Sequence, residues 1–275
     1  MKIRCDDFNL KATLDSGQIF GFHPEEGYHQ GILFGNPVEL SQEGHFIHLK
    51  SPMRIPESRI RSFFDLDRDL TQFYRILRCE PELGMPLRKF QGLRLIRQDA
   101  WEALATFILS SNNNVKRIQG IHKNMCEYFS RRRDSERLGF PTAMEISKTH
   151  ERILRQLGLG YRAPFLLKTA QFLSNNPEYL EAVRESEYRE AVERVMAFPG
   201  IGPKVADCVL LYGFNRLDAF PVDVWILRAM RKFYFKNRKV DEKKVHAFGR
   251  QRWGPMAGYV QQYMFHACRT GLYEF

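Results

Sequence analysis

The sequence predicts an α+β fold in which a small antiparallel β-rich N-terminal lobe packs on a mainly helical body. Two observations support this prediction. Strand signals separated by turns occupy residues 1 to about 52, and apolar residues recur at helical spacing from Pro56 onward. The chain has 275 residues, of which 44% are hydrophobic and 27% charged, so it can hold one large domain or about two ordinary ones. We expect an N-terminal domain over residues 1–95 and a helical domain over residues 96–275.

The expected elements follow in chain order. Residues 28–34, 37–40 and 45–49 carry strand signals, and turn residues between them (35–37 and 42–44) predict an antiparallel meander. After Gly92 almost every segment has helical spacing, including two apolar stripes that begin at Trp101 and Ile118. Further helices are expected near residues 150–157, 162–174, 178–182, 187–197, 204–213, 223–235 and 256–269.

The net charge indicates a polyanionic partner. Forty-two Lys and Arg residues against 32 Asp and Glu residues give +10, which favours nucleic acid ahead of an acidic membrane face. Mostly apolar runs such as residues 205–214 are shorter than the ~20 residues that a membrane helix needs. The chain does not open with a signal-peptide pattern, so we expect an intracellular protein of the cytoplasm or nucleoid, or of the nucleus in a eukaryote.

The cysteines argue against a metal or disulfide framework. All five are single, without a C-x-x-C pair, which disfavours a zinc ribbon, an iron–sulfur centre and a set of disulfides. The dispersed histidines supply no ligand cluster either. We therefore expect neither a catalytic metal nor a cofactor. The cysteines are Cys5, Cys79, Cys126, Cys208 and Cys268.

Residues 198–204, Phe-Pro-Gly-Ile-Gly-Pro-Lys, predict a helix–hairpin–helix. One helix ends at Phe198 and another begins at Pro203, because proline is preorganised for a first helical turn. Gly200 and Gly202, on either side of Ile201, allow the backbone to approach an anion, and free amides at the new helix can hold a phosphate oxygen. This arrangement favours binding to a DNA backbone. Taken alone, the segment favours the simpler interpretation, a plain turn between helices.

Two side chains near this hairpin are candidates for chemistry. Lys204 lies in the first turn of the new helix, where the helix dipole disfavours a positive charge, so its amine can be partly neutral, as a nucleophile must be. Nineteen residues on, Asp223 precedes the helix expected at 224–235. It can cap that helix and also place a carboxylate at the helix mouth. For the aspartate alone, capping is the simpler interpretation.

Together these motifs resemble those of the helix–hairpin–helix DNA glycosylases, and within them the 8-oxoguanine DNA glycosylase/AP lyases. The resemblance rests first on residues 199–208, Pro-Gly-Ile-Gly-Pro-Lys-Val-Ala-Asp-Cys, followed by Pro-Val-Asp at 221–223. It extends from about residue 8 to residue 270. The supporting segments, in order, are Ser-Gly-Gln-Ile-Phe at 16–20, Leu-Arg-Leu-Ile-Arg-Gln-Asp at 93–99 with Ser-Ser-Asn-Asn-Asn at 110–114, Leu-Gly-Leu-Gly-Tyr-Arg-Ala at 157–163, and Trp-Gly-Pro at 253–255 with Gln261 and Phe265.

The resemblance implies base-excision repair of double-stranded DNA that contains oxidised guanine, preferentially opposite cytosine. Lys204 would attack the sugar of a flipped nucleotide, expel the base and form a Schiff base, from which β-elimination cuts the strand. Asp223 would stabilise positive charge on the sugar. The backbone carbonyl of Gly17 would distinguish 8-oxoguanine, which has a donor at N7, from guanine, which has an acceptor there.

The resemblance also implies the other contacts. Gln261 would bind the Watson–Crick edge of the base, and Phe265 and Cys208 would sandwich its ring; from composition alone, the last two are simply core residues. Trp225 stands where relatives carry histidine near a phosphate, so it can donate one hydrogen bond but brings no charge. On the DNA side, Asn112 and Asn113 would contact the gap left by the flipped base, Arg117 and Arg162 would bind the orphaned cytosine, and Tyr161 would wedge the stack.

Three other interpretations compete with this one. A glycosylase of the endonuclease III type normally carries a four-cysteine iron–sulfur cluster near its C-terminus, where this chain has only Cys268. A monofunctional alkylbase glycosylase lacks the lysine that stands here as Lys204. A DNA-binding module without activity would leave the co-occurrence of Lys204, Asp223, Gly17 and Gln261 unexplained. No protein partner is implied, and we expect a monomer.

Overall fold

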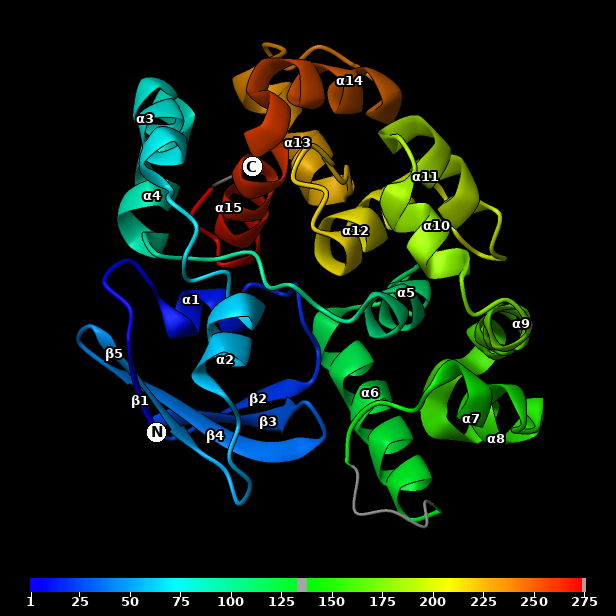
Figure 1. The fold of residues 1–275 in the computed structure, drawn as a ribbon. Coiled ribbons are helices and arrows are strands. Elements are labelled where there is room, and N and C mark those ends of the chain that lie inside the picture. Colours follow the sequence, from blue (N-terminus) through cyan, green and yellow to red (C-terminus); the bar gives the residue numbers. More distant parts are fainter. Residues whose placement is uncertain (133–137, 274–275) are drawn as a thin grey trace.

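The computed structural model describes residues 1–132 and 138–273, and within them five strands form one antiparallel sheet (Figure 1). The strands lie in the order β1-β5-β4-β3-β2, so the first strand of the chain pairs with the last. The predicted meander is confirmed for β3, β4 and β5. Neither β1 nor β2 is predicted, because strands of three and four residues show too little alternation to be recognised. The strands are β1 (Lys2–Arg4), β2 (Phe22–Glu25), β3 (Tyr28–Leu33), β4 (Asn36–Glu43) and β5 (Phe46–Lys50).

The rest of the described chain is mainly helical, which confirms the predicted fold class. Four helices are missing from the prediction. The helices α1, α4 and α7 have only five to seven residues, too few to show a clear period. The first turn of α14 is a charged run, capped by Asp241, with few apolar residues to reveal a period. The helices are α1 (Leu10–Leu14), α2 (Glu57–Phe63), α3 (Thr71–Cys79), α4 (Gly84–Phe90), α5 (Ala100–Ile108), α6 (Val115–Ser130), α7 (Ala143–Ser147), α8 (Glu151–Leu154), α9 (Ala163–Asn175), α10 (Tyr179–Glu185), α11 (Tyr188–Met196), α12 (Pro203–Phe214), α13 (Val224–Phe233), α14 (Glu242–Trp253) and α15 (Ala257–Arg269).

Two apolar cores hold the fold together. The smaller core packs one face of the sheet against α2, with Leu40, Ile47 and Ile60 fully buried. The larger core joins the helices from α3 to α15. Apolar side chains from Leu70 to Leu95 belong to this larger core. The expected boundary at residues 95 and 96 stays a prediction.

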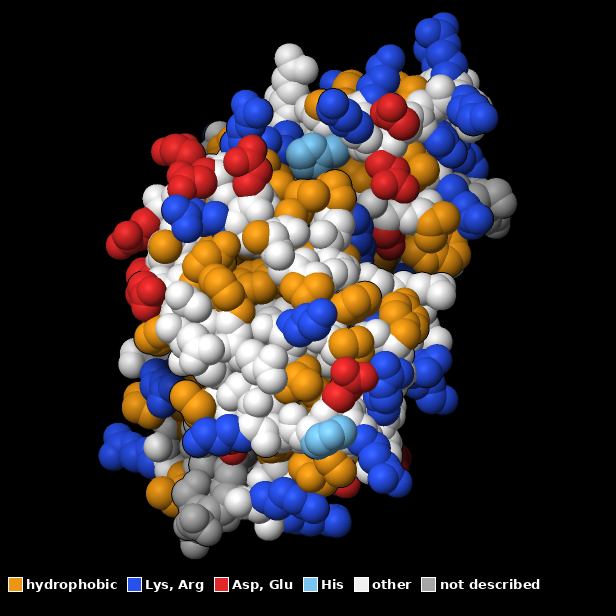
Figure 2. All heavy atoms as spheres, turned by 90° about the vertical axis from the view of Figure 1, so that its right-hand side faces the viewer, with side chains coloured by type: hydrophobic (Ala, Val, Ile, Leu, Met, Phe, Trp, Pro, Cys, Tyr) orange, Lys and Arg blue, Asp and Glu red, His pale blue; other side chains and the backbone are white. Residues whose placement is uncertain are grey.

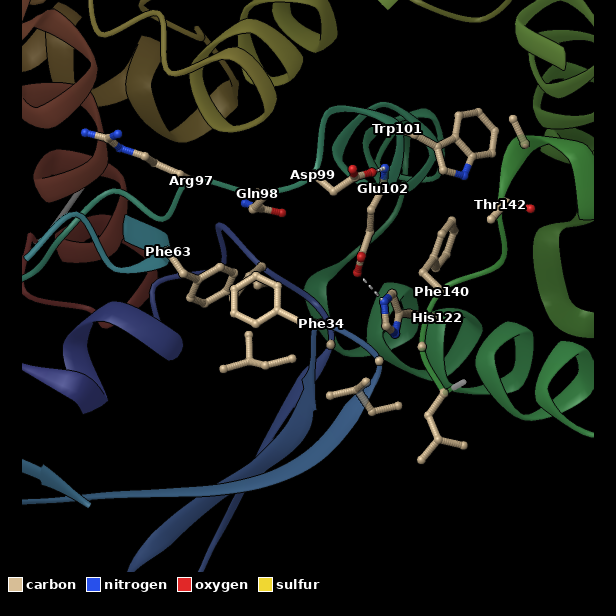
Figure 3. A pocket seen from close by; sticks show the side chains of 18 of the residues that line it. Phe34, Phe63, Arg97, Gln98, Asp99, Trp101, Glu102, His122, Phe140 and Thr142 are labelled. Carbon is tan, nitrogen blue, oxygen red and sulfur yellow. Dashed lines mark hydrogen bonds and ion pairs between the residues drawn. The ribbon is translucent and has the colours of Figure 1, made fainter. Parts of the chain in front are cut away.

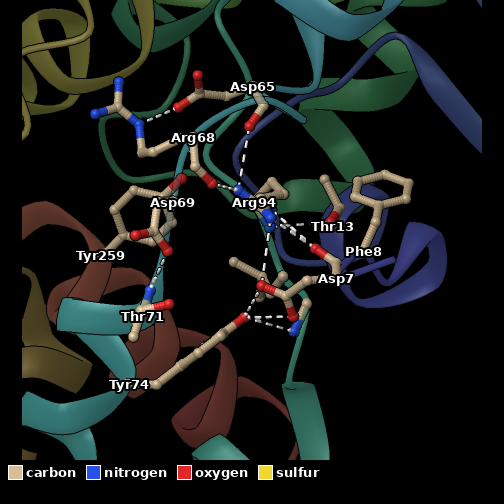
Figure 4. A network of polar contacts seen from close by, with 12 residues as sticks. Asp7, Phe8, Thr13, Asp65, Arg68, Asp69, Thr71, Tyr74, Arg94 and Tyr259 are labelled. Atoms are coloured by element: carbon tan, nitrogen blue, oxygen red, sulfur yellow. Dashed lines mark hydrogen bonds and ion pairs between the residues drawn. The ribbon is translucent and has the colours of Figure 1, made fainter. Parts of the chain in front are cut away.

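The buried side chain of Arg94 connects the N-terminal segment to the loop after α2 (Figure 4). Its guanidinium donates to the carbonyl oxygen of Asp7 at 2.8 Å, to that of Asp65 at 3.2 Å and to that of Arg68 at 2.6 Å. The hydroxyl of Tyr74 on α3 donates to the side-chain carboxylate of Asp7 at 2.9 Å. Because a buried cation needs several acceptors, this network fixes the N-terminal segment against the loop after α2.

Among the described helices, none is both long and apolar enough to cross a membrane.

Candidate functional site

The hairpin between α11 and α12 begins with a glycine that no other residue could replace without strain. Gly200 has φ +81°, and a Cβ there would lie 2.5 Å from Cδ2 of Phe165. Pro203 occupies the first turn of α12, as predicted, whereas α11 ends at Met196, two residues before the predicted end. Gly202 is the N-cap residue of α12 and offers no side chain to the first amides, which leaves them available to an anion. The turn places Lys204 at the start of α12.

A cavity of about 400 Å³ opens beside Lys204. The start of α12 forms one wall, the start of α13 and one face of α15 form others, and the segment after α1 completes it. The lining residues are Gly17, Phe20, Phe107, Ser110, Asn113, Asn114, Val115, Lys116, Ile118, Lys204, Cys208, Tyr212, Asp223, Trp225, Gln261, Phe265 and Arg269. The structure therefore gathers seven side chains singled out in the sequence, together with Gly17, around one cavity.

Lys204 and Asp223 are half-buried and share this cavity. Asp223 caps α13, as predicted, by accepting a hydrogen bond from the backbone N–H of Ile226 at 2.8 Å. Burial raises the pKa of the Asp223 carboxyl, although the amides of Ile226 and Trp225 and the charge of Lys204 oppose this shift. The Asp223 carboxyl therefore caps α13 in an environment whose burial disfavours the charged form of the group.

Cys208 lies one turn after Lys204 on α12, and its thiol side chain lines the same cavity. Burial raises the pKa of this thiol to about 11, so it is a neutral group at physiological pH. Lys204 Nζ lies 6.0 Å from the ring centroid of Phe107, which stacks on Tyr212. The amine is therefore surrounded on this side by neutral and aromatic groups.

The segment that carries Gly17 is anchored from both sides. Before the glycine, Gln262 on α15 donates to the carbonyl oxygen of Ser16 at 3.1 Å. After it, the Gln18 side chain donates to the carbonyl oxygen of Arg94 at 2.8 Å and accepts from the N–H of Ile96 at 2.8 Å. Both glutamines are fully buried, and Gly17 itself adopts φ +83°. These bonds fix the position of the Gly17 backbone at the cavity wall.

Gln261 and Phe265 lie one turn apart on α15 and face the cavity. The Gln261 side chain is buried, yet its Oε1 atom has no hydrogen-bond partner among the described residues. Buried carbonyl oxygens without a donor are uncommon because they lose their bonds to water. A ligand in the cavity with an N–H group aimed at this atom would satisfy it.

The asparagine run links α5 to α6 next to the cavity. Asn114 caps α6 by accepting from the N–H of Arg117, and Asn113 donates to the carbonyl oxygen of Leu109 at 3.0 Å. Asn112 is exposed and adopts φ +47°, a conformation that asparagine tolerates better than most residues. This loop therefore turns Asn112 outward, while Asn113 and Asn114 line the cavity.

The Asn112 turn is supported from the segment before α9. Arg162 is buried and donates to the carbonyl oxygens of Ser111, with Nε at 3.0 Å, and of Asn112, with Nη2 at 2.9 Å. The guanidinium of Arg162 lies 4.3 Å from the ring centroid of the exposed Tyr161. The Tyr161 hydroxyl also donates to the carbonyl oxygen of Ser111. None of Asn112, Arg117, Tyr161 and Arg162 is among the described residues that line the cavity.

Trp225 lies in the first turn of α13, is 36% exposed and lines the cavity beside Asp223. The guanidinium of Arg228, one turn later, lies 5.6 Å from the ring centroid of Trp225.

Seen from the side of α8 to α11, Lys and Arg side chains gather along the right and lower edges of the molecule, and acidic ones gather at the upper left (Figure 2). The positive charge is therefore distributed unevenly over this face.

Sequence reasoning missed several residues that shape the site. Asp207 on α12 is buried, accepts from the Tyr188 hydroxyl at 2.5 Å and pairs with His246 at 2.9 Å, which ties the helix of Lys204 to α11 and α14. Arg269 follows Phe265 by four residues on α15, and this spacing could have revealed it as a cavity residue. Gln262 gives no such signal, because its partner Ser16 is 246 positions away.

A second cavity, of about 590 Å³, lies between the sheet and the helices α5 and α6 (Figure 3). It contains an ion pair in which His122 contacts Glu102 at 2.8 Å. Burial opposes the charged imidazole, but hydrogen bonds to Cys126 and Glu102 raise the pKa of His122 to about 10. No lysine is among the described residues that line this cavity, so it lacks the amine that the chemistry requires.

Comparison with known families covers most of the chain. Residues 1–104 match the 8-oxoguanine DNA glycosylase N-terminal domain, and residues 105–255 match the HhH-GPD superfamily of base excision DNA repair proteins.

Individual relatives agree with these matches. The probable N-glycosylase/DNA lyase of Methanothermobacter thermautotrophicus is 30% identical over 100% of this chain and 98% of its own length. N-glycosylase/DNA lyase OGG1 of Arabidopsis thaliana is 26% identical over 97% of this chain and 79% of its own. Among solved structures, the Clostridium acetobutylicum 8-oxoguanine glycosylase/lyase bound to double-stranded DNA with cytosine opposite 8-oxoguanine is 30% identical, with a TM-score of 0.88 over 99% of both chains. This chain therefore belongs to the HhH-GPD superfamily of base excision DNA repair proteins, and within it to the N-glycosylase/DNA lyases that carry an 8-oxoguanine DNA glycosylase N-terminal domain.

Proposed function

We propose that this protein removes 8-oxoguanine opposite cytosine from double-stranded DNA and then cuts the strand at the resulting site. One observation carries the proposal: a single cavity holds the Lys204 amine, the Asp223 carboxyl and the unsatisfied buried Oε1 of Gln261. The first two supply the chemistry, and the third supplies an acceptor for a base. The Clostridium enzyme of similar fold binds DNA of this kind, which supports the same substrate here.

Lys204 is the nucleophile in this proposal. The neutral amine attacks C1′ of the flipped nucleotide, the C1′–N9 bond breaks, and the base leaves with a proton. The sugar ring opens to an imine with Lys204, and loss of a C2′ proton then expels the 3′ phosphate. Asp223 faces the positive charge that develops on the sugar, and its environment favours a partner cation, because burial makes the isolated carboxylate unfavourable.

Recognition of the lesion is proposed to use Gly17 and Gln261. The Watson–Crick edge of an oxidised guanine presents N1–H and N2–H donors, which the unpartnered Gln261 Oε1 can accept. At N7 the lesion carries a hydrogen and guanine carries a lone pair. The carbonyl oxygen of Gly17 attracts the first and repels the second, while Phe265 and Cys208 enclose the ring.

The DNA backbone and the opposite strand would contact surfaces beside the cavity. We propose that Asn112 and Asn113 occupy the gap left by the base, with Tyr161 wedged beside them. Arg117 and Arg162 would donate to the orphaned cytosine. The hairpin amides of Gly200, Ile201 and Gly202 would hold a phosphate, and the Trp225 indole would add one donor. A monomer suffices for this arrangement, and the monomer stays a prediction.

Trapping with borohydride tests the proposal. Incubation with an 8-oxoguanine:cytosine duplex should give a covalent protein–DNA adduct, because borohydride reduces the imine, and Lys204→Gln should abolish it. The same duplex with thymine, adenine or guanine opposite the lesion should react more slowly. An adduct that persists in Lys204→Gln would place the nucleophile elsewhere, and equal reaction with undamaged duplex would contradict the substrate.

A further inference from the structure

Arg269 is a cavity residue to which neither the helix–hairpin–helix motif nor the base-binding set assigns a role. It is the last residue of α15, on the face that also carries Gln261 and Phe265. Its guanidinium lies directly against Gly17: a Cβ added to that glycine would lie 2.1 Å from Nη1 and 3.2 Å from Cζ of the arginine. Its Cζ atom is 5.8 Å from the Phe265 ring centroid.

This guanidinium has no hydrogen bond or ion pair with the residues that the structure describes, although the residue as a whole reaches solvent. Burial lowers the pKa of Arg269, and the charge of Asp15 opposes that shift only in part. Asp15 is itself engaged by His29 at 2.9 Å and by Lys11 at 2.7 Å. An arginine that only stabilises the negative end of the helix dipole can remain in solvent. Here the guanidinium lies against Gly17 at the cavity wall, and no described residue supplies it with an acceptor.

The position beside Gly17 identifies which oxygen would fit. In an 8-oxopurine the N7–H and the C8 carbonyl oxygen are adjacent on the same edge of the ring. If the N7–H faces the Gly17 carbonyl, the C8 oxygen comes next to whatever group packs on Gly17, and that group is Arg269. Guanine has a C8–H at this place, which would leave the guanidinium without an acceptor.

We propose that Arg269 donates a hydrogen bond to the C8 carbonyl oxygen of the flipped base and so determines specificity together with Gly17. This inference rests on the proposed function. It makes lesion recognition a two-point reading of one edge: the backbone of Gly17 accepts from N7–H, and Arg269 donates to the neighbouring oxygen. The shared chemistry, an oxygen with partial negative charge, would also suit a backbone phosphate, and the experiment separates the two.

The test compares two reactions of the same proteins. Single-turnover release of 8-oxoguanine requires the base, whereas cleavage of a duplex with a preformed abasic site does not. Arg269→Leu should slow release of the base by about tenfold to a hundredfold, the effect of losing a hydrogen bond that involves a charged group. Cleavage at the abasic site should change less than about threefold. Arg269→Lys, which keeps one charged donor, should lie between Leu and wild type in base release.

Arg4→Leu is the matched control, because it removes the same charge from β1, where the side chain is 73% exposed. A thermal unfolding curve for each variant shows that it is folded. Equal losses in both reactions, with a log–log salt slope of duplex binding reduced by about 0.9, would assign Arg269 to a phosphate and overturn the proposal. Unchanged base release in Arg269→Leu would overturn it too. If wild type releases no 8-oxoguanine, the proposed function itself fails, and this inference fails with it.

Discussion

Asp223→Asn would separate two roles that the structure combines in one carboxyl group. Asp223 accepts the Ile226 N–H at 2.8 Å as the cap of α13, and it faces the cavity with Lys204. Asparagine caps helices as well as aspartate does and carries no charge to desolvate. We therefore expect Asp223→Asn to unfold near the wild-type temperature and to bind an abasic-analogue duplex with nearly wild-type affinity. Its rate of base release should fall about 10²- to 10³-fold, the usual loss of one group that stabilises developing charge.

Asp223→Ala supplies the magnitude of the capping role. Removing an N-cap side chain costs about 1 kcal/mol. In a protein of this size, 1 kcal/mol lowers the unfolding temperature by roughly 2–4 °C. Asp223→Ala should therefore unfold about 2–4 °C below Asp223→Asn and lose the same amount of activity. Differential scanning calorimetry and single-turnover kinetics with enzyme in excess measure the two quantities separately.

The pH dependence gives the sign of the charge effect. Because burial raises the pKa of Asp223 above the ordinary value of 3.8, the folded state holds this proton more tightly than the unfolded chain. Wild-type stability therefore falls as the pH rises from 3.8 through the raised pKa of Asp223. The stability of Asp223→Asn relative to wild type should accordingly be greatest at neutral pH and decrease in acid. The wild-type rate should fall as the carboxylate is protonated. A wild-type rate in Asp223→Asn would refute a catalytic role for the carboxylate. Equal losses of rate and duplex affinity would refute it too, and only the capping role of Asp223 would remain.

Two further predictions concern the frame around the site. Gly200→Ala should lower the free energy of unfolding by about 1–3 kcal/mol and weaken duplex binding, because an alanine at φ +81° is strained and its Cβ meets Phe165. Gly202→Ala, where a Cβ meets no atom within 4 Å, is its control and should cost less than about 1 kcal/mol; equal effects in calorimetry would contradict the explanation. Arg94→Met should cost about 3 kcal/mol or more, since it leaves the carbonyls of Asp7 and Arg68 without donors and removes one of two donors from that of Asp65. The unfolding temperature should then fall by roughly 6 °C or more. The exposed control Arg4→Met should change little, and a wild-type unfolding temperature for Arg94→Met would show that water replaces the guanidinium.

Local signals predicted the parts of the site that depend on neighbouring residues. The start of α12 at Pro203 and the cap of α13 at Asp223 follow from proline and aspartate chemistry within one turn, and both are confirmed. The end of α11 was predicted two residues late, because the Ala-Phe pair after Met196 continues the helical pattern while the chain already turns. Helix ends are generally less determined by sequence than helix interiors.

Long-range contacts were beyond reach of the same reasoning. The pairing of β1 with β5 joins residues about 45 positions apart, and the bond between Gln262 and Ser16 joins residues 246 positions apart. Nothing in either local sequence specifies its partner. The unpartnered Gln261 Oε1 and the open guanidinium of Arg269 emerge only once α15 is packed against the segment of Gly17. The roles of the individual site residues stay predictions until the variants are measured.

The two glutamines that hold the Gly17 segment have a consequence for accuracy. A wall that discriminates by repulsion works only if it does not yield, because a wall that moved back by a fraction of an ångström would admit undamaged guanine, which outnumbers the lesion many times over in a genome. Gln18 and Gln262 anchor the chain immediately on each side of the glycine. Given the role proposed for Gly17, the stiffness of this short stretch, rather than its affinity for the lesion, would limit how often an intact base is removed by mistake.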